Sequence, residues 1–209
     1  MEKFRDRFDA GKKLAEELKK YSFKDPLILA LLRGGVPVAR EIAKALAIPM
    51  DIWVVRKIGA PWQPEFSIGA IAEGGHIWLA AETIEEMGIT ESELNALIEG
   101  KKLEMKERIF FYRGLHQRPT ISGRTIILVD DGIATGATMC AAAGAVREEK
   151  PLEIVLAVPV AASDALSFLR TVTDREISLL CPENLVAVGA WYEDFSQVSD
   201  EEVLSMLKS

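Results

Sequence analysis

The chain has 209 residues, 49% of them hydrophobic and 27% charged, which fits one soluble globular domain with a full core. The formal net charge of −7 and the isoelectric point of about 5.1 argue against nucleic acid or an anionic membrane as the main partner. No apolar run approaches the roughly 18 residues of a membrane span, and two distant cysteines argue against a disulfide scaffold, so we expect a cytoplasmic protein.

The first predicted strand ends in a turn that suits an anion. Residues 5–20 have the apolar spacing of an amphipathic helix, and residues 27–32 form the continuous apolar run of a buried strand. Arg33, Gly34 and Gly35 follow directly. Glycines let the backbone approach a ligand closely, and an arginine can pair with two phosphate oxygens. The alternative is an ordinary tight turn with a solvated arginine.

The next predicted strand, residues 51–55, continues into the basic pair Arg56 and Lys57. These two side chains either bind an anion or form an ordinary solvated strand end. Residues 60–66 contain two prolines and no hydrophobic period, so we expect an extended loop there.

Two different segments precede the centre of the chain. Residues 67–72 and 76–80 alternate as short strands around a Glu-Gly-Gly turn, which predicts a hairpin. Residues 83–115 are dense in Glu, Lys and Leu, and Thr90 with the glutamate three residues later matches a helical capping box. We therefore predict a helical insertion at residues 83–118.

The most informative stretch begins with the apolar run of residues 125–129, a predicted buried strand. Asp130 and Asp131 stand where that strand ends, and a glycine-rich turn then opens a helix. Unpaired N–H groups and the helix dipole make such a turn an anion site, while the adjacent acids suit a polyol or hydrated magnesium. Neither a P-loop nor a GxGxxG motif is present. The candidate residues of the turn are Gly132, Ala134, Thr135, Gly136, Ala137 and Thr138.

The last part of the chain supplies further strands and an aromatic stretch. Residues 153–159 read as another buried strand, with Val160 and Ala161 at its carboxyl end. Trp191 and Tyr192 belong to an aromatic-rich stretch. Strands are also predicted at residues 177–180 and 185–188, and helices at residues 36–47, from residue 163 and at residues 199–208.

Apolar strands that alternate with helices predict an α/β fold with a central parallel sheet flanked by helices. Ligands of such sheets bind beyond the carboxyl ends of the strands, and Arg33, Lys57 and Asp130 all fall at that edge. We predict a single domain, residues 1–209, in which residues 185–209 form a C-terminal cap.

The sequence Ile-Leu-Val-Asp-Asp-Gly-Ile-Ala-Thr-Gly-Ala-Thr, residues 127–138, closely resembles the phosphoribosyl-pyrophosphate (PRPP) signature of type I phosphoribosyltransferases. Leu-Leu-Arg-Gly-Gly, residues 31–35, resembles their pyrophosphate loop, and the Arg-Lys-x-Gly stretch is similar to adenine and orotate enzymes. The whole chain is most similar to stand-alone bacterial members whose acceptor is unassigned. The resemblance implies the fold of that family, with a mobile hairpin that closes over the site.

The resemblance also implies a reaction. A 5-phosphoribosyl group would pass from PRPP to a nucleobase or similar nitrogen heterocycle, with release of pyrophosphate, in nucleotide or nucleoside metabolism. Asp130 and Asp131 would hold the ribose hydroxyls and stabilise the ribosyl cation, and the glycine-rich turn would bind the 5′-phosphate. Mg²⁺, held mainly by PRPP and reached by the two acids through water, would assist.

The resemblance also implies that the segments after the first two predicted strands bind the pyrophosphate of PRPP. Their residues are Arg33, Gly34, Gly35, Arg56 and Lys57. With Mg²⁺ they would neutralise the leaving group.

The acceptor site stays open. Val160, Ala161, Trp191 and Tyr192 are candidates for contacting the base, and Glu65 is the candidate that would handle its proton. The Arg-Lys-Ile-Gly stretch lacks the lysine that follows this glycine in the adenine enzymes, so adenine is not assigned as the acceptor.

Two other functions also stay open. The fold serves as a PRPP-binding regulator without catalysis in some families, and the aspartate pair would suit a phosphate-ester or nucleotide hydrolase. In each case the expected partners are small molecules rather than nucleic acid or membrane, and the resemblance implies a homodimer.

Overall fold

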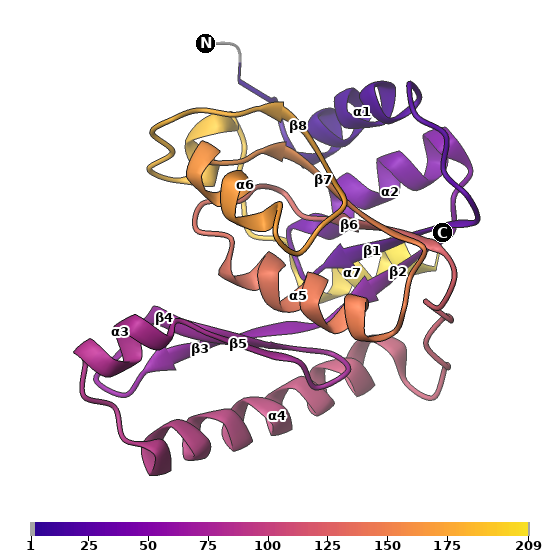
Figure 1. The fold of residues 1–209 in the computed structure, drawn as a ribbon. Helices are drawn as coiled ribbons and strands as arrows, with labels where there is room; N and C mark the ends of the chain where they lie inside the picture. Colours follow the sequence, from indigo (N-terminus) through magenta and orange to yellow (C-terminus); the bar gives the residue numbers. More distant parts are fainter. Residues whose placement is uncertain (1–2, 209) are drawn as a thin grey trace.

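A five-stranded parallel sheet forms the centre of the protein, in the order β2-β1-β6-β7-β8 (Figure 1). All of its pairings are parallel. The computed structural model, which describes residues 3–208, therefore confirms the predicted α/β architecture. The strands are the apolar runs β1 (Pro26–Leu31), β2 (Met50–Trp53), β6 (Thr125–Val129), β7 (Glu153–Val160) and β8 (Arg175–Leu180).

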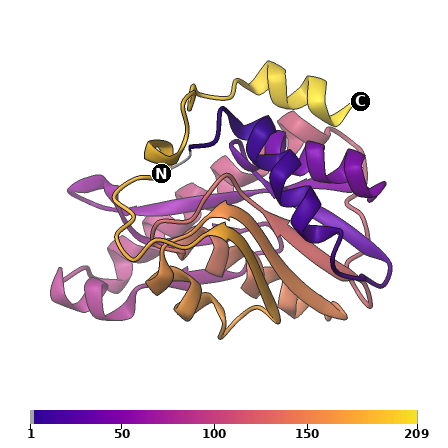
Figure 2. The same cartoon turned by 90° about the horizontal axis from the view of Figure 1, so that it is seen from above.

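Helices cover both faces of this sheet, which is why its strands are apolar on both sides. Ile28 and Ile127 point to one helical layer, whereas Leu29 and Leu128 point to the other. The first layer contains α1 (Arg7–Leu18), α2 (Gly35–Leu46) and α7 (Asp200–Leu207), seen together along one side in Figure 2, and the second contains α5 (Ala137–Glu148) and α6 (Ser163–Leu169). Within residues 3–208, no helix has the length and apolar character needed to cross a lipid bilayer.

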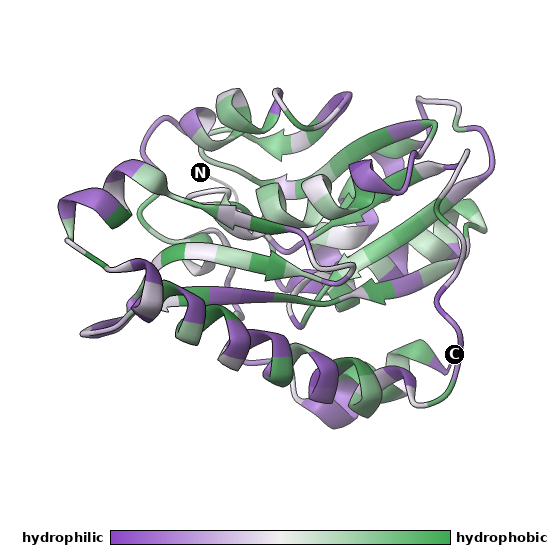
Figure 3. Cartoon of the chain, turned by 60° about the horizontal axis from the view of Figure 1, so that its bottom comes forward, coloured by the Kyte–Doolittle hydropathy of each residue, from purple (hydrophilic) through white to green (hydrophobic). Residues whose placement is uncertain are grey.

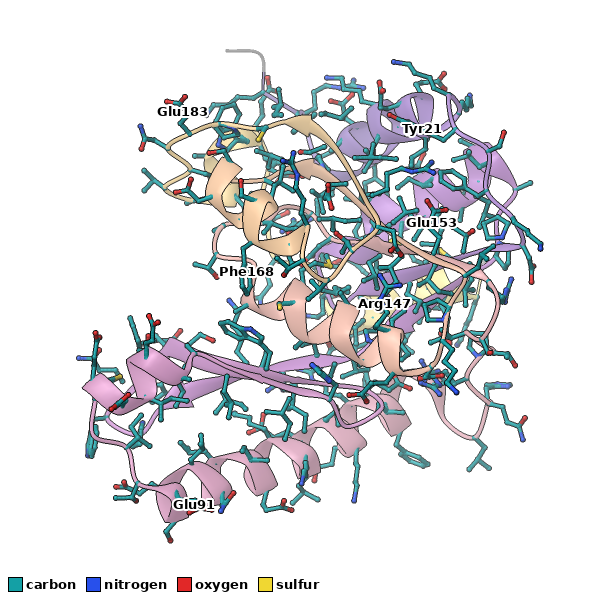
Figure 4. All side chains as sticks on the ribbon, in the orientation of Figure 1. Tyr21, Glu91, Arg147, Glu153, Phe168 and Glu183 are labelled. Atoms are coloured by element: carbon teal, nitrogen blue, oxygen red, sulfur yellow. The ribbon has the colours of Figure 1, made fainter. Side chains whose placement is uncertain are left out.

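A second, antiparallel sheet lies between α5 and α4 (Figure 1). The hairpin predicted at the Glu-Gly-Gly turn joins its second and third strands. Phe168 of α6, labelled in Figure 4, lies edge-on to Trp78 of this sheet with ring centroids 6.0 Å apart. The elements of this layer are β3 (Val55–Ala60), β4 (Gln63–Ala72), β5 (Ile77–Leu79), α3 (Ala81–Glu86) and α4 (Glu91–Arg113).

Helix α4 begins at the predicted capping box. Glu93 N donates to Thr90 Oγ1 at 3.3 Å, and Thr90 N donates to Glu93 Oε2 at 2.9 Å. One side of α4 covers the second sheet, where Ile98 packs with Ile58 and Ile68. Figure 3 shows hydrophilic and hydrophobic positions following one another along its ribbon.

Three predicted segments were wrong. The strand predicted at residues 51–55 breaks at Val54, after which the chain leaves the central sheet and starts β3. The loop predicted at residues 60–66 is mostly strand, because the register shifts around Gly59 accommodate the extra residues and Pro64 as an irregular bulge. Residues 185–188 form no strand, because the chain leaves the sheet after its edge strand β8 and enters a 3₁₀ helix.

A buried ion pair fastens the β4–β5 turn to the central sheet. Arg113, the last residue of α4, donates to the carboxylate of Glu73, and their side chains are only 7% and 8% exposed. The same guanidinium donates to Asp51 Oδ2 at 3.1 Å and to Ile52 O at 3.0 Å. The turn between β4 and β5 is thus held by β2 and α4.

Replacing Glu73 by Gln should destabilise the protein strongly, because it leaves the buried Arg113 guanidinium without its main counterion. We expect a loss of about 3–5 kcal/mol in the free energy of unfolding, measured with urea. Glu16→Gln removes an exposed ion pair, in which Lys19 and Glu16 are 47% and 71% exposed, and is the matched control. It should change stability by less than about 1 kcal/mol, and equal losses in the two variants would contradict the assignment.

Candidate functional site

A cleft of about 500 Å³ opens at the carboxyl ends of β1 and β6. These strands are parallel neighbours in register, with Ala30 opposite Val129, so the turns that follow them meet at one edge of the sheet. The predicted residues that line the cleft are Gly34, Arg56, Lys57, Asp130, Asp131, Gly132, Ala134, Thr135, Gly136 and Thr138.

The glycine-rich turn between β6 and α5 presents backbone donors to this cleft. Ile133 N donates to Val160 O at 2.9 Å, which anchors the turn on the end of β7. Gly136 caps α5 with a left-handed φ of 82°, a conformation that glycine adopts without steric cost. Ala134 and Thr135 are exposed just before the helix, where unpaired N–H groups and the helix dipole favour an anion.

The carboxylate of Asp131 is held by an arginine from the N-terminal helix. Arg7 Nε donates to Asp131 Oδ2 at 2.7 Å, and the two side chains are 11% and 14% exposed. The Arg7 guanidinium also lies 3.8 Å from the centroid of the Phe195 ring and donates to Ser196 O at 2.7 Å. The Tyr192 hydroxyl donates to Asp131 O at 2.6 Å. Both ends of the chain therefore fix the position of Asp131.

The two adjacent carboxylates are costly to ionise. Burial, reinforced by the charge of Asp131, raises the pKa of Asp130 well above its ordinary value. The hydrogen bond from Asp131 N, at 2.9 Å, and the charge of Lys57 act in the opposite direction. Burial also raises the pKa of Asp131, against the lowering effect of Arg7. Such a pair favours positive charge and hydrogen-bond donors in the cleft.

Gly34 brings the two turns into contact. A Cβ at this position would overlap Asp131 Oδ2, so a larger residue would push the carboxylate and the turn apart. Gly35 and Ala137 lie in the first turns of their helices and do not line the cleft. Gly35 instead packs against Val129 O at the end of β6.

Arg33 turns away from the cleft. It follows a cis peptide bond, and its Nη1 lies 3.2 Å from Asp200 Oδ1 at the start of α7. Arg108 and Tyr112 of α4 also donate to this carboxylate, Arg108 at 3.0 Å. Burial and the bond to Asp200 raise the pKa of Tyr112 to about 12, and the bond from Tyr112 lowers the pKa of Asp200. The cluster therefore joins the turn after β1 to α4 and α7.

Arg56 and Lys57 lie within β3 and both line the cleft. Arg56 Nη2 donates to Glu104 Oε2 of α4 at 2.5 Å, so its charge is already paired. Lys57 is exposed, and no ion pair to it is found within residues 3–208. It is the lysine available to an incoming anion.

Besides Arg33, Gly35 and Ala137, five further predicted residues do not line the cleft. Glu65 is exposed on β4. Val160 and Ala161 are fully buried beneath the glycine-rich turn, and Tyr192 is 3% exposed, with its hydroxyl bound to backbone. Trp191 borders a separate cavity of about 450 Å³. None of these side chains contributes to the wall of the main cleft.

Sequence reasoning also missed residues that do form the site. Arg7 lies 124 positions from its partner Asp131, and nothing local in the sequence marks that contact. The apolar lining residues were assigned to predicted strands, to a helix face or, for Ile133, to the signature turn, and none was predicted to contact a ligand. They are Leu32, Val55, Ile133, Met139 and Val188.

Comparison with known proteins agrees with this geometry. The family model described as phosphoribosyl transferase domain matches residues 2–176. A Mycobacterium tuberculosis protein, provisionally named a phosphoribosyl transferase, is 40% identical over 207 residues. That match covers 99% of this chain but 47% of the relative, so the chain spans about half the length of the curated relatives it matches.

Solved structures show the same architecture over nearly the whole chain. The protein TT1426 of Thermus thermophilus is 40% identical with a TM-score of 0.83, and the match covers 99% of this chain and 98% of that one. A purine phosphoribosyltransferase of Pyrococcus horikoshii, 16% identical with a TM-score of 0.50 over 93% of each chain, shares the fold. The fold and cleft thus define a type I phosphoribosyltransferase architecture. The chain belongs to the phosphoribosyl transferase domain family.

Replacing Asp130 by Asn should stabilise the ligand-free protein at neutral pH. Because the folded protein raises the pKa of Asp130, the wild type loses stability as pH rises through the interval between the unfolded and folded pKa values. The variant escapes this loss, so urea unfolding at pH 7.5 should give it a higher free energy of unfolding than the wild type. The advantage should shrink toward pH 4, whereas exposed Glu183→Gln should show none. An Asn variant less stable at pH 7.5 would contradict the stated burial cost.

Proposed function

We propose that the protein transfers the 5-phosphoribosyl group of PRPP to the nitrogen of a heterocycle such as a nucleobase, with release of pyrophosphate. The observation that carries the proposal is the meeting of two turns at one cleft, with a carboxylate pair between them. A sugar monophosphate needs one anion site. A ribose with phosphate at one end and pyrophosphate at the other needs both.

The 5′-phosphate fits the turn before α5. Its oxygens would accept hydrogen bonds from the backbone of residues 134–138 and from the hydroxyls of Thr135 and Thr138, both of which line the cleft. The dipole of α5, a helix of 12 residues, favours the same negative charge.

The ribose would lie over Asp130 and Asp131, whose oxygens can accept from its hydroxyls. Cleavage at the anomeric carbon builds positive charge on the ribosyl group, and two buried carboxylates stabilise that charge more than they stabilise neutral ribose. Arg7 holds the Asp131 carboxylate in place through an ion pair. The carboxylate therefore needs little reorganisation when positive charge develops on the ribosyl group.

The pyrophosphate would lie between Gly34 and Lys57. Without a Cβ, Gly34 lets the phosphate oxygens approach its backbone, and Lys57 supplies a positive charge. Arg56 adds a second charge at the same wall. Arg33 can contribute only if its guanidinium leaves Asp200.

Mg²⁺ fits this donor set, because Asp130 and Asp131 supply carboxylate oxygens, the ligand type that hard cations prefer. We propose that PRPP itself provides most of the ligands, with the acids contributing through water. When bound, the ion neutralises charge on the departing pyrophosphate.

The acceptor would face the apolar part of the cleft, where Val55, Ile133, Met139 and Val188 provide a surface for a flat heterocycle. This assignment replaces the aromatic residues expected from the sequence, since Trp191 does not line the cleft. We further propose a cytoplasmic homodimer, in keeping with the family resemblance.

A PRPP-binding regulator is the second candidate. It is favoured by the exposed position of Glu65 away from the cleft, which leaves the proposed reaction without the expected proton-handling group. The fold alone does not separate the two functions.

The decisive experiment incubates the protein with PRPP, magnesium and a panel of purine and pyrimidine bases, and measures pyrophosphate release. We expect release that depends on one class of base. Binding of PRPP without release in any mixture would support the regulator, and release without any base would indicate a hydrolase. Failure to bind PRPP would overturn both PRPP-based functions.

The double variant Asp130→Asn, Asp131→Asn should lose most of the stabilisation that PRPP gives. For the wild type, PRPP with magnesium at about 100 times its dissociation constant should raise the free energy of unfolding by about 2.7 kcal/mol. The free energy of unfolding of each protein is measured with and without PRPP. The difference reports PRPP binding, independently of any change that the substitutions make to the stability of the ligand-free protein. An undiminished gain in the double variant would show that the ligand binds elsewhere.

Gly34→Ala should weaken PRPP binding at least about tenfold, because the added methyl group overlaps Asp131 Oδ2 and forces the two turns apart. Ser205→Ala is the control, since Ser205 is exposed on α7 and lies outside the cleft. Titration calorimetry measures both. Equal affinity of the two variants would contradict the role given to Gly34.

A further inference from the structure

Helix α4 has an outer face that no other element of residues 3–208 covers. Of its 23 residues only Ile98, Met105, Tyr112 and Arg113 are buried, and these belong to the side that faces the rest of the protein. Large apolar side chains nevertheless lie outside, with Leu103 60% and Phe110 66% exposed. Large apolar side chains exposed on the same side of a helix are candidates for an interaction surface.

The outer face has the spacing of a coiled-coil seam. Its exposed residues follow one another at intervals of four, three, four, three and four, which keeps them on one line along the helix. Three members are small, two are large and apolar, and one is charged. This outer seam consists of Ala96, Gly100, Leu103, Glu107, Phe110 and Gly114.

We infer that the outer seam of α4 is the docking surface for a second copy of this chain, with the two α4 helices packed antiparallel. The small and large residues are arranged so that the seam complements itself. When two copies run in opposite directions with Phe110 opposite Gly100, the same register sets Leu103 opposite Glu107. It also sets Ala96 opposite Gly114. Each aromatic ring then fills the space that a glycine leaves, as close helix packing requires.

The charges of the seam fit this arrangement. The two-fold axis of that register passes at Met105, so Lys106 of one copy lies three residues along the axis from Glu107 of the other. At 1.5 Å per residue this is about 4.5 Å, within one helical turn. Two reciprocal Lys–Glu pairs would therefore flank the apolar contacts, and both side chains are exposed in the single chain. A parallel arrangement would set Glu107 against Glu107.

One residue of the seam, Glu107, lines a cavity next to the functional cleft. Glu107 and Phe111 line a cavity of about 270 Å³ together with Arg56 and Asp200, and Arg56 also lines the main cleft. A second copy on the seam would contact the rim of that cavity. This inference gives the proposed homodimer its surface, and it does not depend on which acceptor the protein uses.

The first test measures mass by light scattering or sedimentation over a micromolar concentration series. The wild type should form a dimer, and Leu103→Glu with Phe110→Glu should weaken it at least about tenfold. The controls Leu152→Glu and Val186→Glu change residues that are 52% and 95% exposed away from α4. They should leave the dimer intact. A monomeric wild type, or equal dimerisation in all variants, would overturn the inference.

The second test fixes the orientation and does not require disruptive changes. In a Cys181→Ser background, Leu103→Cys and Glu107→Cys variants are prepared separately and oxidised alone or mixed. The antiparallel register predicts a disulfide-linked dimer in the mixture and little in either variant alone. Crosslinking within each variant alone would overturn the antiparallel register. Pyrophosphate release is measured in parallel, so a monomeric but active protein would disprove the docking surface and leave the proposed function standing.

Discussion

The functional site depends on one close approach, that of the Asp131 carboxylate to Gly34. The two residues follow neighbouring parallel strands, and a side chain at position 34 would occupy the place of Asp131 Oδ2. Arg7 holds that carboxylate from the other side at 2.7 Å. The spacing of the two turns is therefore set by three residues: Gly34 lies against the Asp131 carboxylate, and Arg7 binds the same carboxylate from its other side.

The ion pairs around the cleft determine which groups remain available to an anionic ligand. Around the cleft, Arg7 is paired with Asp131, Arg33 with Asp200 and Arg56 with Glu104. Positive potential then comes mainly from Lys57 and from backbone N–H groups at the start of α5, which are directional donors. We therefore expect the cleft to bind only ligands whose anionic groups reach those donors, in a chain of net charge −7.

How far the sequence predicts this structure depends on the range of the forces involved. The central strands are apolar runs such as residues 125–129, and a parallel sheet necessarily gathers the turns that follow them. The second sheet was only partly predicted. The prolines at 61 and 64 indicated a loop, whereas an irregular β-bulge allows the chain there to form the start of β4. The partnership of Arg7 with Asp131 was missed because Arg7 does not differ locally from an ordinary charged helix residue.

The remaining consequence concerns the C-terminal helix. Asp200 lies in the first turn of α7, next to the capping residue Ser199, and accepts from Arg33, Arg108 and Tyr112. A carboxylate with several charged and hydroxyl donors is a strong internal anion, as the lowered pKa of Asp200 indicates. Any phosphate that draws Arg33 into the cleft must compete with it. In the proposed function, the position of α7 and the positive charge available to a pyrophosphate are therefore linked, because both depend on the guanidinium of Arg33.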